Sequence, residues 1–295
     1  MTDPGIRLLG QNDYQALERF LASHLASSMF LIGNARSSGL KDDGSRFSGT
    51  YAGVFKDDTL TGVIAHYWNG NIIPQAPSHL EPLLETLLRA SGRPVYGVLG
   101  PAGQVDMIVE TLSIDPTLAK LHETESLYHL SLSDLVLPQG LKQPEVVARR
   151  IEPGDEELMT RWRIAYSLEN LGDSDTPELR EACRQSIQHY ILSRQLWVLQ
   201  VDGEPVSCSA FNASINEAVQ IGGVFTPPPL RCRGYARAVV AASLLEARQQ
   251  GVPQAILFTG NENRAARRAY EALGFRQTGW FKLFLLTEPI WPALP

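Results

Sequence analysis

Residues that could do chemistry gather in one stretch near the C-terminal end of the chain, from Thr226 to Tyr270. An apolar segment, Val219 to Phe225, leads into prolines, and the turn Arg231-Cys-Arg-Gly-Tyr-Ala-Arg237 then precedes an amphipathic helical pattern. The first turn of a helix has unpaired N–H groups and a partial positive charge, so it can hold an anion. Gly234 lacks a Cβ and lets a bulky anion approach the backbone. The pattern predicts a site for a ligand that carries a diphosphate.

This anion-binding loop is expected to act mostly through its backbone, so that Gly234 and Ala236 matter more than the other side chains. The arginines would add charge-assisted donors, and Cys232 is expected to be incidental. The alternative is a loop that only caps a helix, with its arginines in solvent. The predicted loop residues are Arg231, Cys232, Arg233, Gly234, Tyr235, Ala236 and Arg237.

The elements that must position this loop follow one order, β-α-α-β-β-β-α-β-α-β, in both halves of the chain. The expected fold class is therefore α/β, with a mixed sheet in each of two tandem domains. The segment Pro138 to Pro144 is typical of a linker, which predicts domains at residues 1–137 and 145–295. The alternative is that the elements of the first half were assigned by analogy with the second. In the second half, strands are expected at Val146–Ile151, Leu196–Gln200, Pro205–Phe211, Glu217–Phe225 and Gln254–Thr259, with one or two more in Arg276–Leu286. Helices are expected at Asp155–Leu171, Thr176–Leu192, Gly234–Gln250 and Asn263–Leu273.

Composition narrows the class of protein. A chain of 295 residues has room for about two domains, and 44% hydrophobic with 20% charged residues is ordinary for a globular protein. The net charge of −6 argues against broad nucleic-acid binding. No apolar run approaches the length of a membrane span, and no secretory signal is visible. The three scattered cysteines suggest reduced thiols and no metal site, so a cytoplasmic location is expected.

The second half of the chain, roughly Val146 to Leu286, resembles the GNAT superfamily of acyl-CoA-dependent N-acyltransferases. Arg231-x-x-Gly234-x-Ala236 matches the family's phosphate loop, [QR]-x-x-G-x-[GA]. Downstream, Asn263-x-x-Ala266-x-x-x-Tyr270 and then Leu273-Gly274-Phe275 match the family's second motif. Two motifs in this order are more specific for the GNAT superfamily than either motif alone. The resemblance implies that the diphosphate ligand is acetyl-CoA.

The resemblance also implies roles for residues on either side of the loop. In the family, the strand before the loop splays from its neighbour and its backbone pairs with the pantetheine arm, which here would involve Val224, Phe225 and Thr226. Gly222-Gly223 fits such a splayed strand, although a plain β-bulge is the alternative. Asn263 and Ala266 would contact the cofactor, and Arg264, Arg267 and Arg268 would either meet a phosphate or lie in solvent.

Tyr270 is the general acid that the resemblance implies. Acyl transfer from a thioester to an amine expels a thiolate, which a phenol can protonate. The alternative is a core tyrosine that packs against Phe275.

A base, or a water chain leading to one, must take the proton from the attacking ammonium, and Glu169 on the helix Asp155–Leu171 is a candidate. Leu158, Trp162, Ala165 and Glu169 form one helical stripe, so Glu169 continues an apolar face and is expected to be partly buried with a raised pKa. The alternatives are an ion pair with a nearby arginine or a solvated carboxylate. Trp162 and Tyr166 could line an acceptor pocket or pack in the core.

The first half looks like a degenerate copy of the same fold. Pro74-Gln-Ala-Pro-Ser-His79 stands where the phosphate loop would be, without glycine or arginine. This half would shape the acceptor site or a dimer contact, or only add stability.

Together these features predict an acetyl-CoA-dependent N-acetyltransferase in which a primary amine attacks the thioester in a ternary complex. The acceptor would be a small amine, an amino acid or a protein amine, with no nucleic acid or membrane as partner. Two alternatives stay open: a transferase of related tandem fold that uses aminoacyl-tRNA, and a non-catalytic protein that binds or senses CoA.

Overall fold

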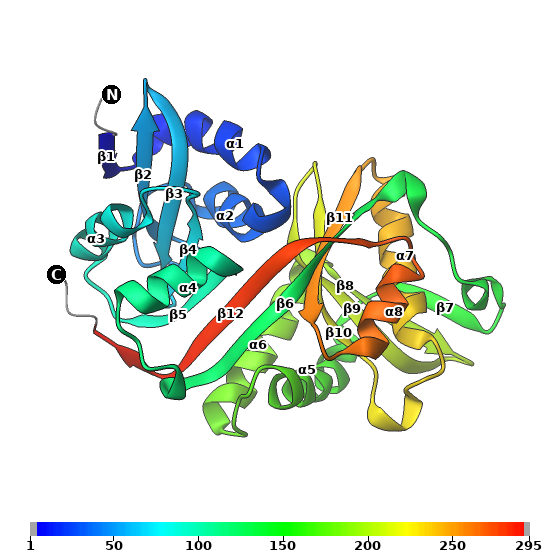
Figure 1. Cartoon of the computed structure of the whole chain (residues 1–295). Coiled ribbons are helices and arrows are strands. Elements are labelled where there is room, and N and C mark those ends of the chain that lie inside the picture. The colour runs from blue at the N-terminus through cyan, green and yellow to red at the C-terminus, as the bar shows by residue number, and fades with distance from the viewer. Residues whose placement is uncertain (1–4, 292–295) are drawn as a thin grey trace. The chain divides into compact units, whose positions relative to one another are not determined.

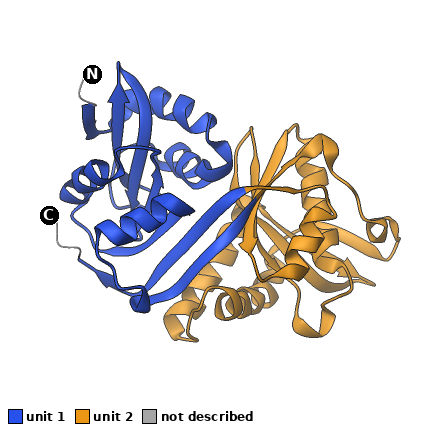
Figure 2. Ribbon diagram, viewed as in Figure 1, with its two compact units in different colours: residues 1–127, 279–295 blue, residues 128–278 orange. Residues whose placement is uncertain are grey.

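The computed structural model describes residues 5–291, which divide into two compact units (Figure 2). Unit 2 comprises Tyr128–Thr278, and unit 1 comprises the chain up to Leu127 together with the segment from Gly279 onward. Each unit is a mixed α/β structure whose elements follow the predicted order, and the predicted fold class is confirmed (Figure 1).

In unit 2 the strands are arranged in the order β6-β11-β10-β9-β8-β7. β10 runs antiparallel to β9 and parallel to β11. Alternating side chains of β8 divide between the two faces of the sheet: Trp197 and Leu199 belong to the core beneath α7, and Leu196 and Val198 to the core beneath α5 and α6. The elements are β7 (Val146–Arg150), α5 (Glu156–Asn170), α6 (Pro177–Ser193), β8 (Leu196–Val201), β9 (Glu204–Ser214), β10 (Val219–Phe225), α7 (Tyr235–Gln249), β11 (Gln254–Gly260) and α8 (Arg264–Glu271).

Local sequence explains where several of these elements begin. Thr176 caps α6 because its hydroxyl accepts a hydrogen bond from Leu179 N at 3.2 Å, and Pro177 occupies the first helical position. Asp202 and Gly203, both with positive φ, form the tight turn between β8 and β9.

Unit 1 repeats the arrangement with the strand order β1-β2-β3-β4-β5-β12-β6. α3 and α4 cover one core of this sheet. The elements are β1 (Gly5–Leu8), α1 (Tyr14–Ala22), α2 (Leu25–Ser38), β2 (Gly49–Lys56), β3 (Thr59–Tyr67), β4 (Asn71–Gln75), α3 (Leu80–Ser91), β5 (Val95–Pro101), α4 (Ala102–Thr111), β6 (Ala119–Ser131) and β12 (Arg276–Ile290). Short 3₁₀ turns lie at Gln11–Asp13, Pro116–Leu118, Leu132–Asp134, Gln139–Lys142, Pro153–Asp155 and Pro228–Leu230.

The compact units do not follow the predicted division at 1–137 and 145–295. The chain passes from unit 1 into unit 2 within β6, and the predicted linker Pro138–Pro144 lies inside unit 2, where Leu141 packs against the core. The last strand also differs from expectation. Residues from Gly279 belong to unit 1 because β12 pairs antiparallel with β5, with Phe284 opposite Val98.

Among the described residues, no helix is both long and apolar enough to cross a membrane. The same residues contain no group of three or more His, Cys, Asp or Glu side chains placed to hold a metal ion.

Candidate functional site

The predicted loop ends in a glycine that starts α7. Gly234 is the N-cap of the helix and adopts φ +80°, a left-handed conformation that favours glycine. Cys232 shares the positive φ, at +63°. Within the described part of the chain, the backbone N–H groups from Cys232 to Arg237 have no hydrogen-bond acceptor, and the next one, of Ala238, donates to Gly234 O. This row of free donors at a helix N-terminus can receive an anion.

The guanidinium of Arg231 is hydrogen-bonded to neighbouring groups of the protein. Its Nε donates to Thr226 O at 2.9 Å, and its Nη2 donates to Glu169 Oε2 at 2.6 Å. The carboxylate of Glu169 raises the pKa of Arg231. Arg231 therefore holds the end of β10 and the end of α5 at fixed distance from the loop. Arg233 and Arg237, by contrast, lie exposed beside the free N–H groups.

The predicted burial of Glu169 is wrong. Its side chain is 44% exposed and ion-paired with Arg231. Glu169 lies in the last turn of α5, after the buried positions Met159 and Trp162 that contact the sheet. Trp162 is a core residue, with its ring 6.0 Å from that of Phe225.

β10 separates from β11 immediately before the loop. The parallel pairing of the two strands covers only Val219 with Ala255 and Gln220 with Ile256. On its other edge, β10 stays paired with β9 as far as Phe225, with a bulge between Gly222 and Phe225. The edge of β10 that faces β11 is therefore open over its last residues, where an extended ligand could pair with the backbone.

The two glycines of β10 lie at this bulge. A Cβ on Gly222 would overlap the carboxamide of Asn212, with 2.0 Å to Nδ2. Gly223 has φ +57°, and a Cβ there would lie 3.7 Å from Ala210 and 3.9 Å from Arg163 Nη1. Side chains of β9 and α5 thus surround the bulge at close range.

Asn263 has a structural role as the N-cap of α8. Its Oδ1 accepts a hydrogen bond from Ala266 N at 3.1 Å. The Asn-x-x-Ala spacing of the second motif is thus the spacing of a helix cap. Tyr270 lies further along α8, is 9% exposed, and packs edge-on against Phe275 with ring centres 6.0 Å apart.

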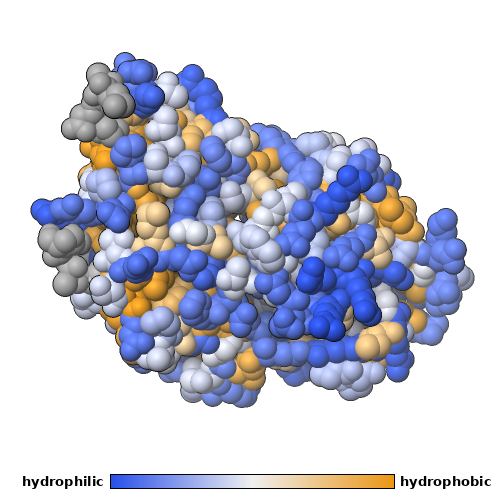
Figure 3. Space-filling model, in the orientation of Figure 1, coloured by the Kyte–Doolittle hydropathy of each residue, from blue (hydrophilic) through white to orange (hydrophobic). Residues whose placement is uncertain are grey.

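The three arginines of α8 differ in their surroundings. Arg267 donates to the hydroxyl of Tyr128 at 3.1 Å, whereas Arg264 and Arg268 are exposed. Figure 3 shows strongly hydrophilic side chains gathered over this helix. A phosphate could reach these two cations without breaking an ion pair.

The equivalent position in unit 1 differs in its free donors and its charge, although β4 also pairs with β5 over only two residue pairs, Asn71 with Gly97 and Ile72 with Val98. Between β4 and α3, the donor of Ala76 is already bound by Gln104 Oε1 at 2.8 Å. A Cβ on Gly100 of β5 would lie only 3.0 Å from the ring of Pro74, so β4 and β5 stay close where β10 and β11 separate. Glu81, in the first turn of α3, adds a negative charge.

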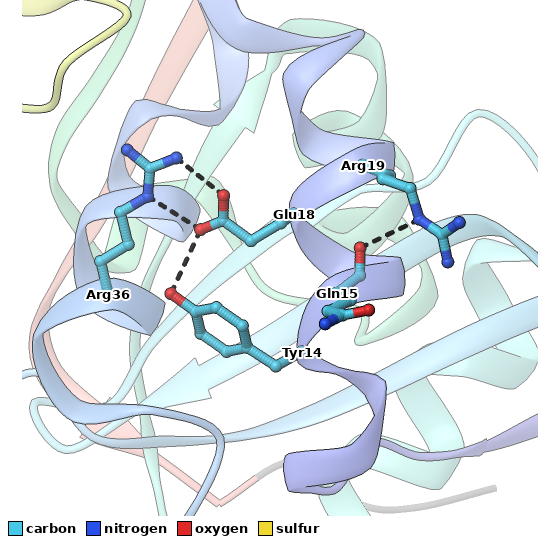
Figure 4. A pocket seen from close by; sticks show the side chains of 5 residues that line it. All are labelled: Tyr14, Gln15, Glu18, Arg19 and Arg36. Carbon is cyan, nitrogen blue, oxygen red and sulfur yellow. Dashed lines mark hydrogen bonds and ion pairs between the residues drawn. The ribbon is translucent and has the colours of Figure 1, made fainter.

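Unit 1 does carry a surface hollow of about 600 Å³ beside α1 and α2 (Figure 4). Glu18 lies at its centre, accepting from Tyr14 OH at 3.2 Å and from Arg36 Nε at 2.8 Å. Because Arg36 also bonds the second oxygen of Glu18 at 2.7 Å, the carboxylate is already neutralised.

Sequence reasoning missed one charged residue near the bulge, Arg163. Its position on α5, one residue after the buried Trp162, places it at the border of the apolar face. That border position was the only signal available, because a helical arginine is usually solvated.

Comparison with known proteins identifies the second half of the chain. Residues 159–275 match the model of the Acetyltransferase (GNAT) family. No curated protein matches the chain in sequence.

Solved structures are similar over nearly the whole chain. A Drosophila protein aligns with a TM-score of 0.66 at 14% identity, covering 96% of this chain and 99% of its own. A GNAT acetyltransferase from Colwellia psychrerythraea gives 0.56 at 15% identity, with 96% and 100% covered. A tandem GNAT protein from the clavulanic acid biosynthesis pathway gives 0.55 at 10% identity, with 99% and 100% covered. At these identities the likeness shows the fold alone. The family match alone marks residues 159–275 as an acetyltransferase domain of the GNAT family.

Proposed function

We propose that this protein is an N-acetyltransferase that moves the acetyl group of acetyl-CoA to a primary amine. One observation carries the proposal: the free N–H groups from Cys232 to Arg237 adjoin the open edge of β10. A ligand with a diphosphate at one end and an extended amide-bearing arm fits both features at once, and acetyl-CoA has that form. The family match of residues 159–275 supports the same donor.

In this proposal the cofactor runs from the loop back along β10. The diphosphate accepts hydrogen bonds from the loop backbone, and the pantetheine arm pairs with Val224, Phe225 and Thr226. Because the arm extends away from the loop, its thioester end lies near Gly223. Asn263 starts α8 beside the cofactor, and the small Ala266 leaves room for it. Unit 1, with its occupied donors and its closed β4–β5 pair, binds no cofactor and acts as a degenerate copy.

The proposed reaction is direct attack in a ternary complex. The amine nitrogen forms a bond to the thioester carbon and loses a proton to solvent water, the C–S bond breaks, and the thiolate takes up a proton. We assign that proton to Tyr270, as the motif implies. Positioning of the two substrates accounts for most of the rate enhancement. Glu169 is not retained as base, because its ion pair with Arg231 uses the carboxylate to hold the loop.

Replacing Tyr270 by Phe tests the assignment of the acid. A lost proton donor is expected to reduce kcat by about 10²-fold or more while leaving KM for acetyl-CoA within about twofold. The measurement is release of CoA thiol with a panel of primary amines, across pH 6 to 10.

Tyr128→Phe is the matched control, since it removes another buried phenol of the same unit. Unchanged kcat in Tyr270→Phe at every pH would contradict the assignment. Binding of acetyl-CoA without turnover on any amine would instead favour a CoA-sensing protein.

A further inference from the structure

Arg163 places a positive charge at the bulge of β10. It extends from α5, and its Nη1 lies 3.9 Å from the position that a Cβ on Gly223 would occupy. The side chain is half-buried. Gly223 therefore leaves a space in front of the guanidinium that a larger residue would fill.

The guanidinium of Arg163 has no anionic partner among residues 5–291. Its charge is met only by the ring of Tyr166, 5.1 Å away, which contacts one face and leaves the in-plane N–H donors free. Arg161 on the same helix offers a contrast, because it is exposed and paired with Glu157 at 2.5 Å. An uncompensated charge that is partly withdrawn from water is costly unless a ligand pairs with it.

Two thiols lie near Arg163, and the carboxylate of Asp173 acts on one of them, Cys183. Cys183 of α6 and Cys208 of β9 both feel its charge, but burial raises the pKa of Cys208 to about 12 and raises that of Cys183 as well. Both thiols therefore stay protonated near neutral pH. On the other side of the bulge, the hydroxyl of Tyr190 lies 3.5 Å from Asn212 Oδ1. The site offers one cation beside two protonated thiols, with the charge of Asp173 opposing that of Arg163 at Cys183.

We propose that Arg163 binds a carboxylate carried by the acceptor, so that the acceptor is an amino acid. This inference rests on the proposed function, which brings the thioester carbon close to Gly223. A carboxylate on Arg163 then holds the adjacent amine beside that carbon. A planar guanidinium suits this role because it can donate two parallel hydrogen bonds to a carboxylate.

The reaction is then the acetylation of an amino acid. The amine nitrogen forms an amide bond to the acetyl carbon and loses a proton to solvent water, the C–S bond of acetyl-CoA breaks, and the departing sulfur takes a proton from Tyr270, which regains one from solvent. The products are an N-acetylamino acid and free CoA. The carboxylate is unchanged, so Arg163 contributes to binding and positioning and takes no part in proton transfer.

The test compares amino acids with their decarboxylated amines, using alanine with ethylamine, leucine with 3-methylbutylamine and phenylalanine with phenethylamine. For the wild type, kcat/KM is expected to be at least about tenfold higher for one or more amino acids than for the matching amine. Arg163→Gln should raise KM for that amino acid at least about tenfold and leave KM for the amine nearly unchanged. Arg161→Gln, which removes a charge from the same helix, should change neither.

Several outcomes would overturn the inference. The first is a wild-type kcat/KM for every amine that equals or exceeds that for the matching amino acid. The second is an equal loss of kcat/KM for the amino acid and the amine in Arg163→Gln. The third is no turnover of any amino acid while acetyl-CoA still raises the melting temperature. A preference for succinyl-CoA over acetyl-CoA that vanishes in Arg163→Gln would place the bound carboxylate on the donor instead. If acetyl-CoA causes no thermal shift in the wild type, the proposed function fails, and this inference falls with it.

Discussion

At the scale of single residues, two buried titratable side chains make the stability of the protein depend on pH. His66 of β3 is fully buried, with Nδ1 2.8 Å from Ser91 Oγ and Nε2 without a partner among the described residues. Burial lowers the pKa of His66 to about 4, and the charge of Arg93 adds to the effect. The unfolded chain, with an ordinary histidine pKa near 6.5, therefore takes up a proton that the folded protein excludes.

Acidification is expected to destabilise the protein through His66. Because the folded pKa lies below the unfolded one, stability falls as pH drops from about 7 towards 4, by about 2 kcal/mol at pH 5. Because Glu125 acts in the opposite direction over this range, the effect of His66 is read from urea unfolding of both proteins, the wild type and His66→Gln, at pH 7 and pH 5. Relative to the wild type, the free energy of unfolding of His66→Gln should rise by about 2 kcal/mol between pH 7 and pH 5. An NMR titration of the wild type gives a second reading: ring signals of His66 that move between pH 7 and 6 would refute the prediction.

Glu125 of β6 acts in the opposite direction. Its Oε2 is buried without a hydrogen-bond partner in the described part of the chain, and burial, aided by the charge of Glu123, raises the pKa of Glu125 to about 7. The folded protein thus holds this proton more tightly than the unfolded chain, and stability is lost as pH rises from 4.5 through 7. Glu125→Gln should be more stable than the wild type by about 3 kcal/mol at pH 8, and the difference should shrink to about 1 kcal/mol or less at pH 5. Equal urea midpoints of the two proteins at pH 8 would be the contrary result.

Individual site residues were only partly predictable. The motif spacing correctly marked Gly234 as the residue that starts α7, since a glycine with positive φ leaves a local trace in sequence. The sequence offered an ion pair of Glu169 with a nearby arginine as an alternative, which is what the structure shows, but it did not indicate that Arg231 is the partner. Glu169 was expected to be buried from helical periodicity, but its contact with Arg231 joins positions 62 residues apart. Such long-range pairs depend on the tertiary fold.

At the scale of elements, β12 belongs to the core of unit 1 although it is the last strand of the chain. Phe284 is fully buried there among residues of α3 and β5, including Leu87 and Val98. Trp280 lies on the same strand but is 51% exposed. Core residues of unit 1 therefore come from both ends of the sequence.

Truncating Phe284 to Ala should loosen unit 1 selectively. A buried Phe-to-Ala change costs about 3–5 kcal/mol through lost burial and a residual cavity. Amide hydrogen exchange should show lost protection in β2 to β5, with β8 to β10 nearly unaffected, and Trp280→Ala should leave both regions protected. Loss of protection confined to unit 2 would show that β12 had been assigned to the wrong core.

At the scale of the whole molecule, the tandem architecture was predictable. The assignment of most of β12 to unit 1 and of the end of β6 to unit 2 was not. Matching element order identified the repeat, because helical and strand periodicities survive where residue identity is lost. The pattern of Arg276–Leu286 predicted a strand correctly, but hydrophobic alternation does not specify which sheet edge the strand joins. The linker at Pro138–Pro144 was expected from composition, whereas the chain changes unit inside β6.

The central claim is that acetyl-CoA binds at the start of α7, and Gly234→Glu tests it most directly. A glutamate there would put a carboxylate among the free N–H groups. The side chain has room, because a Cβ on Gly234 would have only Arg237 Nη2 nearby, at 3.8 Å. Gly203→Glu is the matched control. Its φ of +82° imposes the same backbone strain as the +80° of Gly234, in a hairpin turn on the same unit.

The measurement is the thermal shift caused by acetyl-CoA in the three proteins. At about a hundred times the dissociation constant, the ligand should stabilise the wild type and Gly203→Glu by about 2.7 kcal/mol each. Gly234→Glu should fold with similar stability to Gly203→Glu and show no shift. An equal shift in Gly234→Glu, or no shift in the wild type, would contradict the account.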